Sequence, residues 1–149
     1  MPPVPDPGTV RDFLASTISV LRETTGTSAA VASPGTRRTN EDAIAIIVHA
    51  RGQLSGLTWS FPFELLRDAA RHMVEGIEPD REVCEATASE LANILTGRGA
   101  ASLESHGVVL EIEPPEVGAL ACPGIIAFLT TPNGVIEIIF HGGQAFDEQ

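Results

Sequence analysis

The sequence contains no lysine and no tyrosine, and all nine of its cationic residues are arginines. A Schiff-base lysine, the lysine of a phosphate-binding loop and a tyrosine nucleophile are therefore excluded. Aromatic residues are scarce, with six phenylalanines and one tryptophan, so a platform for stacking nucleic-acid bases is poorly supplied. The two cysteines, Cys84 and Cys122, do not form a C-x-x-C pair, and we expect reduced, mostly buried thiols rather than a zinc knuckle or disulfides.

Positive charge is also in short supply. The 149-residue chain carries 20 acidic and nine basic residues, a formal net charge of −11. Such an excess repels nucleic acids and anionic lipids, so we expect neither as a partner. No segment reaches the roughly 18 apolar residues needed to cross a bilayer, and the proline-rich start lacks the regions of a signal peptide. The sequence thus predicts a cytoplasmic protein whose partner is another protein or a small molecule.

The remaining composition, 43% hydrophobic and 19% charged, is typical of a compact globular domain. We expect a disordered proline-rich tail over residues 1–8, a single domain over 9–142 and an acidic tail over 143–149. Apolar spacing predicts helices over 10–24, from 62 to about 76 and from 81 to about 97, with 104 as an alternative end of the last. Thr9 and Asp80 are the expected caps of the first and third helices. Strands are predicted over 27–33, 43–50, 54–61, 108–112, 125–131 and 135–140.

The short connections between these strands indicate how they pair. Arg51-Gly52-Gln53 separates two β-branched runs, and Pro132-Asn133-Gly134 contains the Asn-Gly pair that favours a tight hairpin turn. The element order therefore predicts an α+β fold, a mainly antiparallel six-stranded sheet packed with three helices.

Sequence motifs of common active sites are absent, including nucleophile elbows, H-E-x-x-H, phosphate loops and calcium loops. The four histidines have no metal-ligand spacing, and we expect His49 and His72 to be structural. The acidic residues Glu111, Glu113 and Glu116 suggest a divalent-ion site, but acids on a strand edge usually face solvent. We therefore expect no metal and no cofactor of the chain's own.

The third helix is the segment that carries chemistry. Advancing by about 100° per residue, the pitch of an α-helix, places its apolar side on one face, formed by Val83, Cys84, Thr87, Ala88, Leu91, Ile94 and Leu95. The opposite face carries Glu82, Ala86, Ser89, Glu90, Asn93 and Gly97. Glu90 and Asn93 are neighbours one turn apart, and the small residues Ala86 and Gly97 lie above and below them. A carboxylate and a carboxamide thus project from a surface that another protein's backbone can approach closely.

The segment Glu90-Leu91-Ala92-Asn93-Ile94-Leu95-Thr96-Gly97 resembles the E-x-x-N helix of the CheX/CheC/FliY phosphatases of bacterial chemotaxis. The single copy and the chain length are most similar to CheX, and the resemblance extends over roughly residues 40–142. Two positions depart from the family pattern. Ala86 stands where Ser or Asp is usual, and Arg98 stands where Asn is common.

The resemblance implies a CheX-like fold and a phosphatase that hydrolyses the aspartyl phosphate of a CheY-like response-regulator receiver domain. Asn93 and Glu90 would be the catalytic residues, with Asn93 orienting the attacking water and Glu90 pairing with the receiver's lysine. Mg²⁺ would belong to the receiver. Docking would involve Ala86, Ser89, Gly97 and Arg98.

Two other interpretations remain open. A non-catalytic receiver-binding or regulatory module of the same fold is favoured by Ala86 and Arg98, while a plain structural or assembly domain would leave the helix face merely solvated. The apolar strands 125–129 and 136–140 would have adhesive edges if unpaired, and CheX-type proteins pair through sheet edges. We therefore also expect a homodimer.

Overall fold

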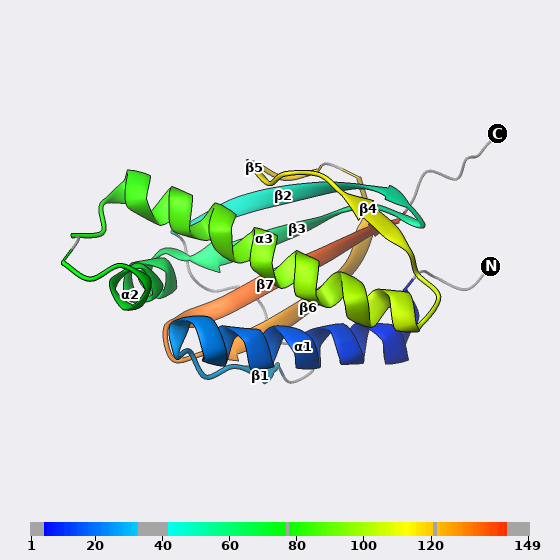
Figure 1. Ribbon diagram of the computed structural model, residues 1–149, viewed down its shortest axis with the longest axis horizontal. Helices are drawn as coiled ribbons and strands as arrows, with labels where there is room; N and C mark the ends of the chain where they lie inside the picture. Colours follow the sequence, from blue (N-terminus) through cyan, green and yellow to red (C-terminus); the bar gives the residue numbers. More distant parts are fainter. Residues whose placement is uncertain (1–4, 33–41, 77, 121, 143–149) are drawn as a thin grey trace.

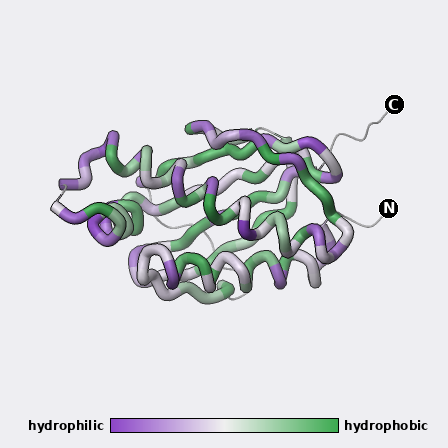
Figure 2. Tube along the Cα trace, in the orientation of Figure 1, coloured by the Kyte–Doolittle hydropathy of each residue, from purple (hydrophilic) through white to green (hydrophobic). Residues whose placement is uncertain are grey.

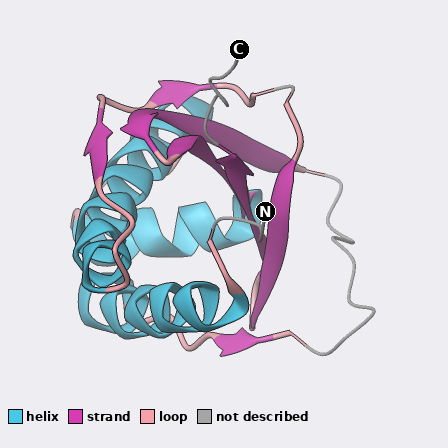
Figure 3. Cartoon of the chain, turned by 90° about the vertical axis from the view of Figure 1, so that its right-hand side faces the viewer, coloured by secondary structure: helices cyan, strands magenta, loops and turns pink. Residues whose placement is uncertain are grey.

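The structure is a computed structural model that describes residues 5–32, 42–76, 78–120 and 122–142. The predicted loop over 34–40, the start of the proline-rich tail and the acidic tail lie outside these residues. Figure 1 shows three helices lying against a twisted sheet, and the view in Figure 3 places all three on the same side of it. The predicted α+β fold is confirmed.

The sheet is antiparallel and has the strand order β1-β6-β7-β3-β2-β4, with β5 pairing with β2. Its centre is built from two hairpins, β2 with β3 and β6 with β7, which join through β3 and β7. Both hairpins follow the turn signals in the sequence. The strands are β1 (Ala30–Val31), β2 (Ala43–Gly52), β3 (Leu54–Pro62), β4 (Leu110–Ile112), β5 (Glu116–Val117), β6 (Gly124–Thr131) and β7 (Gly134–Gly142).

The three helices are α1 (Pro7–Thr25), α2 (Phe63–Met73) and α3 (Arg81–Ser105). In the hydropathy colouring of Figure 2 the central strands are largely hydrophobic, whereas the helices change character from turn to turn. This difference is expected of a half-buried helix layer. Two surface contacts join α1 to α3 and its C-cap: a hydrogen bond of 2.7 Å between His106 Nε2 and Asp12, and an ion pair of 3.6 Å between Arg98 and Glu23.

The core between the helices and the sheet contains an aromatic cluster of Phe13, Trp59, Phe61 and Phe140. All four side chains are completely buried. Trp59 stacks on Phe61 with their centroids 5.9 Å apart, and Phe13 meets Phe140 edge to face at 5.0 Å. Offset stacked and edge-to-face pairs of this kind stabilise a core beyond their buried area. The helix α3 packs on this aromatic cluster.

The start of α1 corrects the sequence prediction. The N-cap is Asp6 rather than Thr9, because the Asp6 side chain accepts hydrogen bonds from both the backbone N–H and the hydroxyl of Thr9. Pro7 follows as the first helical residue, where its fixed φ and missing N–H suit a helix start. Pro7 and Gly8 therefore belong to the helix and not to the predicted tail.

Other differences concern element ends. The strand β5 was not predicted, and β1 has only two residues of the predicted 27–33. The helix α2 ends at Met73 instead of continuing toward Gly76, and Pro62 closes β3 instead of opening the helix. The helix α3 continues through Gly97 to Ser105, which resolves the alternative that the sequence left open.

Candidate functional site on the outer face of α3

The helix α3 begins and ends at recognisable caps. The side chain of Asp80 accepts a hydrogen bond of 2.9 Å from the backbone N–H of Val83, as the sequence predicted. At the other end the chain turns at Gly107, whose φ of +82° is a conformation that favours glycine. Between these caps 25 residues form one helix. The helix α3 crosses the helix layer beside α1 and contacts β4 and β5 (Figure 1).

The predicted inner face of α3 is confirmed. Cys84, Ala88, Leu91 and Leu95 are at most 1% exposed, and Thr87 is also buried. Val83 and Ile94, at the margins of this face, are half-buried. The buried stripe also includes residues that the angular assignment did not name, which are Ala92, Thr96, Gly99 and Leu103.

Glu90 and Asn93 lie on the outer face, as the spacing predicted, and both are exposed. Among the residues that the structure describes, neither side chain forms a hydrogen bond or an ion pair. The carboxylate and the carboxamide are thus available to a partner at neighbouring positions of one helical turn. A carboxylate accepts hydrogen bonds or pairs with a cation, and a carboxamide both donates and accepts.

The residues around this pair leave it accessible. Ala86 and Gly97 are exposed, and a β-carbon built on Gly97 would meet nothing within 4 Å. Ser89 is half-buried beside Glu90. Arg98 is exposed and forms its ion pair with Glu23 of α1. The Arg98 guanidinium therefore lies toward α1, on the flank of the outer face.

The helix is fixed from below at the turn that follows Asn93. The indole Nε1–H of Trp59 on β3 donates a hydrogen bond of 2.9 Å to the Thr96 hydroxyl oxygen. One turn further, Gly99 packs directly on Phe13, so that an added β-carbon would lie 2.2 Å from the ring atom Cε2. The sequence pattern revealed neither contact, because each joins residues far apart in the chain.

A second polar cluster lies away from α3 and was not predicted. His141 is completely buried; its Nδ1 lies 2.8 Å from the Cys122 carbonyl oxygen and its Nε2 lies 2.7 Å from the Thr58 hydroxyl. A carbonyl oxygen can only accept, so Nδ1 carries a proton and donates it to Cys122, while Nε2 shares a hydrogen bond with the Thr58 hydroxyl. Both ring nitrogens are thus occupied by the fold, which makes this cluster structural.

The described residues offer no metal centre. No group of three or more His, Cys, Asp or Glu side chains within them is arranged to hold an ion. Of the suspected acidic residues, Glu111 and Glu113 instead flank Arg51 at 3.7 and 3.8 Å. Cys84 is a free thiol on the inner face of α3, and burial raises its pKa, which keeps it protonated and unreactive.

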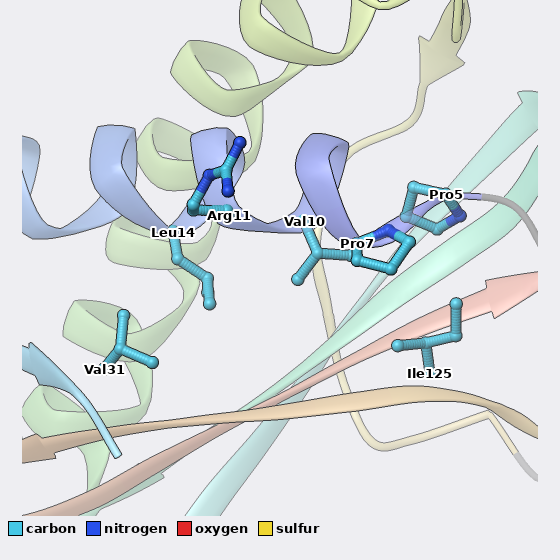
Figure 4. A pocket seen from close by; sticks show the side chains of 7 residues that line it. All are labelled: Pro5, Pro7, Val10, Arg11, Leu14, Val31 and Ile125. Atoms are coloured by element: carbon cyan, nitrogen blue, oxygen red, sulfur yellow. The ribbon is translucent and has the colours of Figure 1, made fainter. Parts of the chain in front are cut away.

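A pocket of about 340 Å³ lies on the other side of α1, away from Glu90 and Asn93. Figure 4 shows its lining, which comes from the start of α1 and from β1 and β6: Pro5, Pro7, Val10, Arg11, Leu14, Val31 and Ile125. The lining is apolar apart from the exposed Arg11 side chain. The pocket brings no nucleophile and no acid–base pair together, so it is not part of the α3 site.

Comparison with known proteins gives a match at the level of structure only. No protein-family model and no curated protein matches the sequence. A putative chemotaxis protein from Desulfovibrio vulgaris Hildenborough superposes with a TM-score of 0.74 at 17% identity, covering 89% of this chain and 95% of that one. The chemotaxis protein CheX from Vibrio vulnificus gives 0.71 at 23% identity, covering 89% and 96%. CheX in the CheX–CheY–BeF₃–Mg²⁺ complex from Borrelia burgdorferi gives 0.69 at 21%, covering 91% and 98%.

The chain therefore has the fold of the CheX and CheC-like chemotaxis proteins. This confirms the sequence resemblance at the level of the fold, over about nine-tenths of the chain. Within the described residues, no helix combines the length and the apolar character that a membrane span requires.

Proposed function

We propose that this protein is a CheX-like phosphatase that accelerates hydrolysis of the aspartyl phosphate on a CheY-like receiver domain. One observation carries the proposal. Glu90 and Asn93 stand exposed on neighbouring positions of α3, without a partner in the described part of the chain, and small residues flank them. The similar structure in which CheX is bound to CheY supports a receiver as the partner.

The role of Asn93 follows from its carboxamide. The amide oxygen accepts a hydrogen bond from a water molecule, and the NH₂ group donates to a phosphoryl oxygen. Held in line in this way, the water attacks phosphorus as the bond to the aspartate oxygen breaks, releasing inorganic phosphate and the free carboxylate. Catalysis by positioning therefore needs no nucleophile and no base from this chain.

Glu90 serves the docking step. The side chain is exposed one turn before Asn93, so it enters the receiver pocket together with the amide. There it pairs with the receiver's lysine and fixes the register of Asn93 over the phosphoryl group. The Mg²⁺ ion that neutralises the phosphoryl oxygens belongs to the receiver, and this chain supplies no cofactor of its own.

The two departures from the family pattern are compatible with this role. Ala86 is exposed, and its small side chain leaves room for a partner's backbone. Arg98 pairs with Glu23 of α1 across 3.6 Å, on the flank of the outer face. A receiver-binding module without catalysis remains the alternative. In that case the missing polar group at Ala86 abolishes hydrolysis, while docking through Ser89 and Gly97 is preserved.

The experiment is the decay of an aspartyl-phosphorylated receiver with and without this protein. We expect Asn93→Ala to reduce the acceleration about 100-fold or more, since loss of positioning alone has effects of this size, with docking largely retained. Glu90→Ala should weaken both docking and hydrolysis. Asp68→Ala, which removes an exposed carboxylate on α2, is the matched control and should behave as wild type. Equal decay with and without wild-type protein, across the cognate receivers, would reject the enzyme, and binding without acceleration would select the alternative.

We also propose a cytoplasmic homodimer that forms through β6. On the outer side of β6, the described residues Ala30–Ala32 bond to Phe128, Leu129 and Thr130, and no described residue pairs there with Gly124–Ala127. Ile126 within this stretch is 52% exposed. An apolar strand near the edge of a sheet favours pairing with another strand. Light scattering should give twice the mass of the chain, and Ile126→Lys should give monomers while leaving the α3 face intact.

A further inference from the structure

The hydrogen bond between Trp59 and Thr96 is a buried connection between the sheet and the site helix. Trp59 is completely buried and Thr96 is 1% exposed. Water therefore cannot replace either partner, and loss of the bond leaves a buried indole N–H without an acceptor. Thr96 lies three residues after Asn93, at the edge of the buried face that adjoins it.

Thr96 uses its hydroxyl differently from other buried threonines of the helices. The hydroxyls of Thr17 and Thr87 each donate to the carbonyl four residues earlier in their own helix, to Phe13 and Val83 respectively. Those bonds hold nothing outside the helix. The Thr96 hydroxyl instead accepts from a side chain of β3.

Trp59 is itself held in place. Its ring stacks on Phe61 and contacts Phe13, with centroid distances of 5.9 Å in both cases. Phe13 in turn fills the space left by Gly99 on α3. The indole is thus a rigid donor, and α3 contacts the aromatic cluster at two points, Thr96 and Gly99, both within two turns after Asn93.

We infer that the Trp59–Thr96 hydrogen bond fixes the rotation of α3 about its own axis and makes Thr96 a positioning residue for Asn93 and Glu90. This inference rests on the phosphatase function proposed above. A rotation of about 10° moves a group about 6 Å from the helix axis by about 1 Å. A displacement of that size is enough to lower the rate of a positioned reaction about 100-fold.

The test compares Thr96→Val, which keeps the shape and removes the acceptor, with Thr96→Ser, which keeps the acceptor. Thr87→Val is the matched control, because it makes the same chemical change at another buried position of α3. We expect Thr96→Val to lower kcat for receiver dephosphorylation by at least about tenfold with a change in KM of less than about threefold. Thr96→Ser should restore kcat, and Thr87→Val should leave it unchanged.

A second measurement does not depend on activity. Residual dipolar couplings of the α3 amides, measured against those of β3 and β7, report the orientation of the helix on the sheet. We expect Thr96→Val to change them and Thr87→Val to leave them as in wild type. If Thr96→Val does not yield folded protein, Trp59→Phe removes the donor instead and should produce the same change.

The outcomes separate the two proposals. Unchanged couplings in Thr96→Val or Trp59→Phe overturn the positioning role, whether or not the protein is a phosphatase. Changed couplings with an unchanged kcat also overturn it. If the wild type does not accelerate dephosphorylation, the phosphatase is rejected, and with it the catalytic consequence assigned to Thr96. Changed couplings in Thr96→Val would then still support the hydrogen bond as what fixes the rotation of α3.

Discussion

Gly97 and Gly99 are two residues apart on α3 and face opposite surroundings. A β-carbon on Gly97 would meet nothing within 4 Å, whereas one on Gly99 would lie 2.2 Å from the Phe13 ring. Because Gly97 has no side chain, the outer face beside Asn93 stays open to a partner. The second lets α3 approach the aromatic cluster.

Alanine substitutions at these two glycines should therefore act in opposite directions. Gly97→Ala should raise the free energy of unfolding by about 0.5–1 kcal/mol, because an exposed helix interior favours alanine over glycine. Gly99→Ala should lower it by about 1–3 kcal/mol, because the methyl group overpacks the core against Phe13. Urea unfolding of both variants provides the measurement, and a stabilised Gly99→Ala would contradict the packing. Under the proposed function, Gly97→Ala should nevertheless weaken docking of the receiver.

The ion pair between Arg98 and Glu23 should contribute little to stability. The two side chains are 59% and 60% exposed and 3.6 Å apart. Exposed pairs of this kind contribute about 0–1 kcal/mol. We expect Arg98→Ala to change the free energy of unfolding by less than about 0.5 kcal/mol. A double-mutant cycle with Glu23→Ala isolates the pair, and a coupling energy above about 1 kcal/mol would show that the pair is stronger than its exposure indicates.

The two thiols should differ in reactivity. Cys84 is completely buried, and burial raises its pKa, so its thiolate fraction is small. Cys122 is half-buried. In the native protein a disulfide reagent should modify Cys122 and spare Cys84 until the chain unfolds. Cys122→Ser should then show no reactive thiol before unfolding, and a fast native reaction in that variant would contradict the packing of α3.

The cap of α1 should make stability depend on pH. The hydrogen bond from the backbone N–H of Thr9, followed by that from its hydroxyl, lowers the pKa of Asp6 in the folded protein. A lowered folded-state pKa means that the stabilisation is present above the ordinary pKa of 3.8 and is lost as pH falls through the folded value. The difference in melting temperature between wild type and Asp6→Ala should therefore be largest near pH 6 and shrink below pH 4. A constant difference would mean that the Asp6 charge has no part in capping.

Local signals in the sequence accounted for the elements that carry the site. Asp80 caps α3 as expected. The periodicity of α3 placed Glu90 and Asn93 on the exposed face, because the regular pitch of a helix puts these positions opposite its buried apolar face. The turn at Asn133-Gly134 likewise fixed the β6–β7 hairpin. The cap at Asp6 was also within reach, since the proline that follows it is a signal for a helix start.

Long-range contacts account for what could not be predicted. The strand β5 follows Pro114-Pro115 and has only two residues, and it exists because Glu116 and Val117 pair with Ile47 and Ile46 of β2. The hydrogen bond between Trp59 and Thr96 joins residues 37 apart in the chain. Such contacts depend on strand register and on the packing of helices against the sheet, for which a single sequence gives no local pattern.

The carboxylate and the amide of α3 are borne by a single helical turn. The separation of their α-carbons is therefore dictated by backbone pitch, and repacking elsewhere in the molecule does not change it while α3 stays helical. Repacking of the surrounding core tilts or rotates the two residues together. Any partner that contacts both residues would therefore sense the orientation of α3 on the sheet, while the spacing of the two backbone positions stays constant.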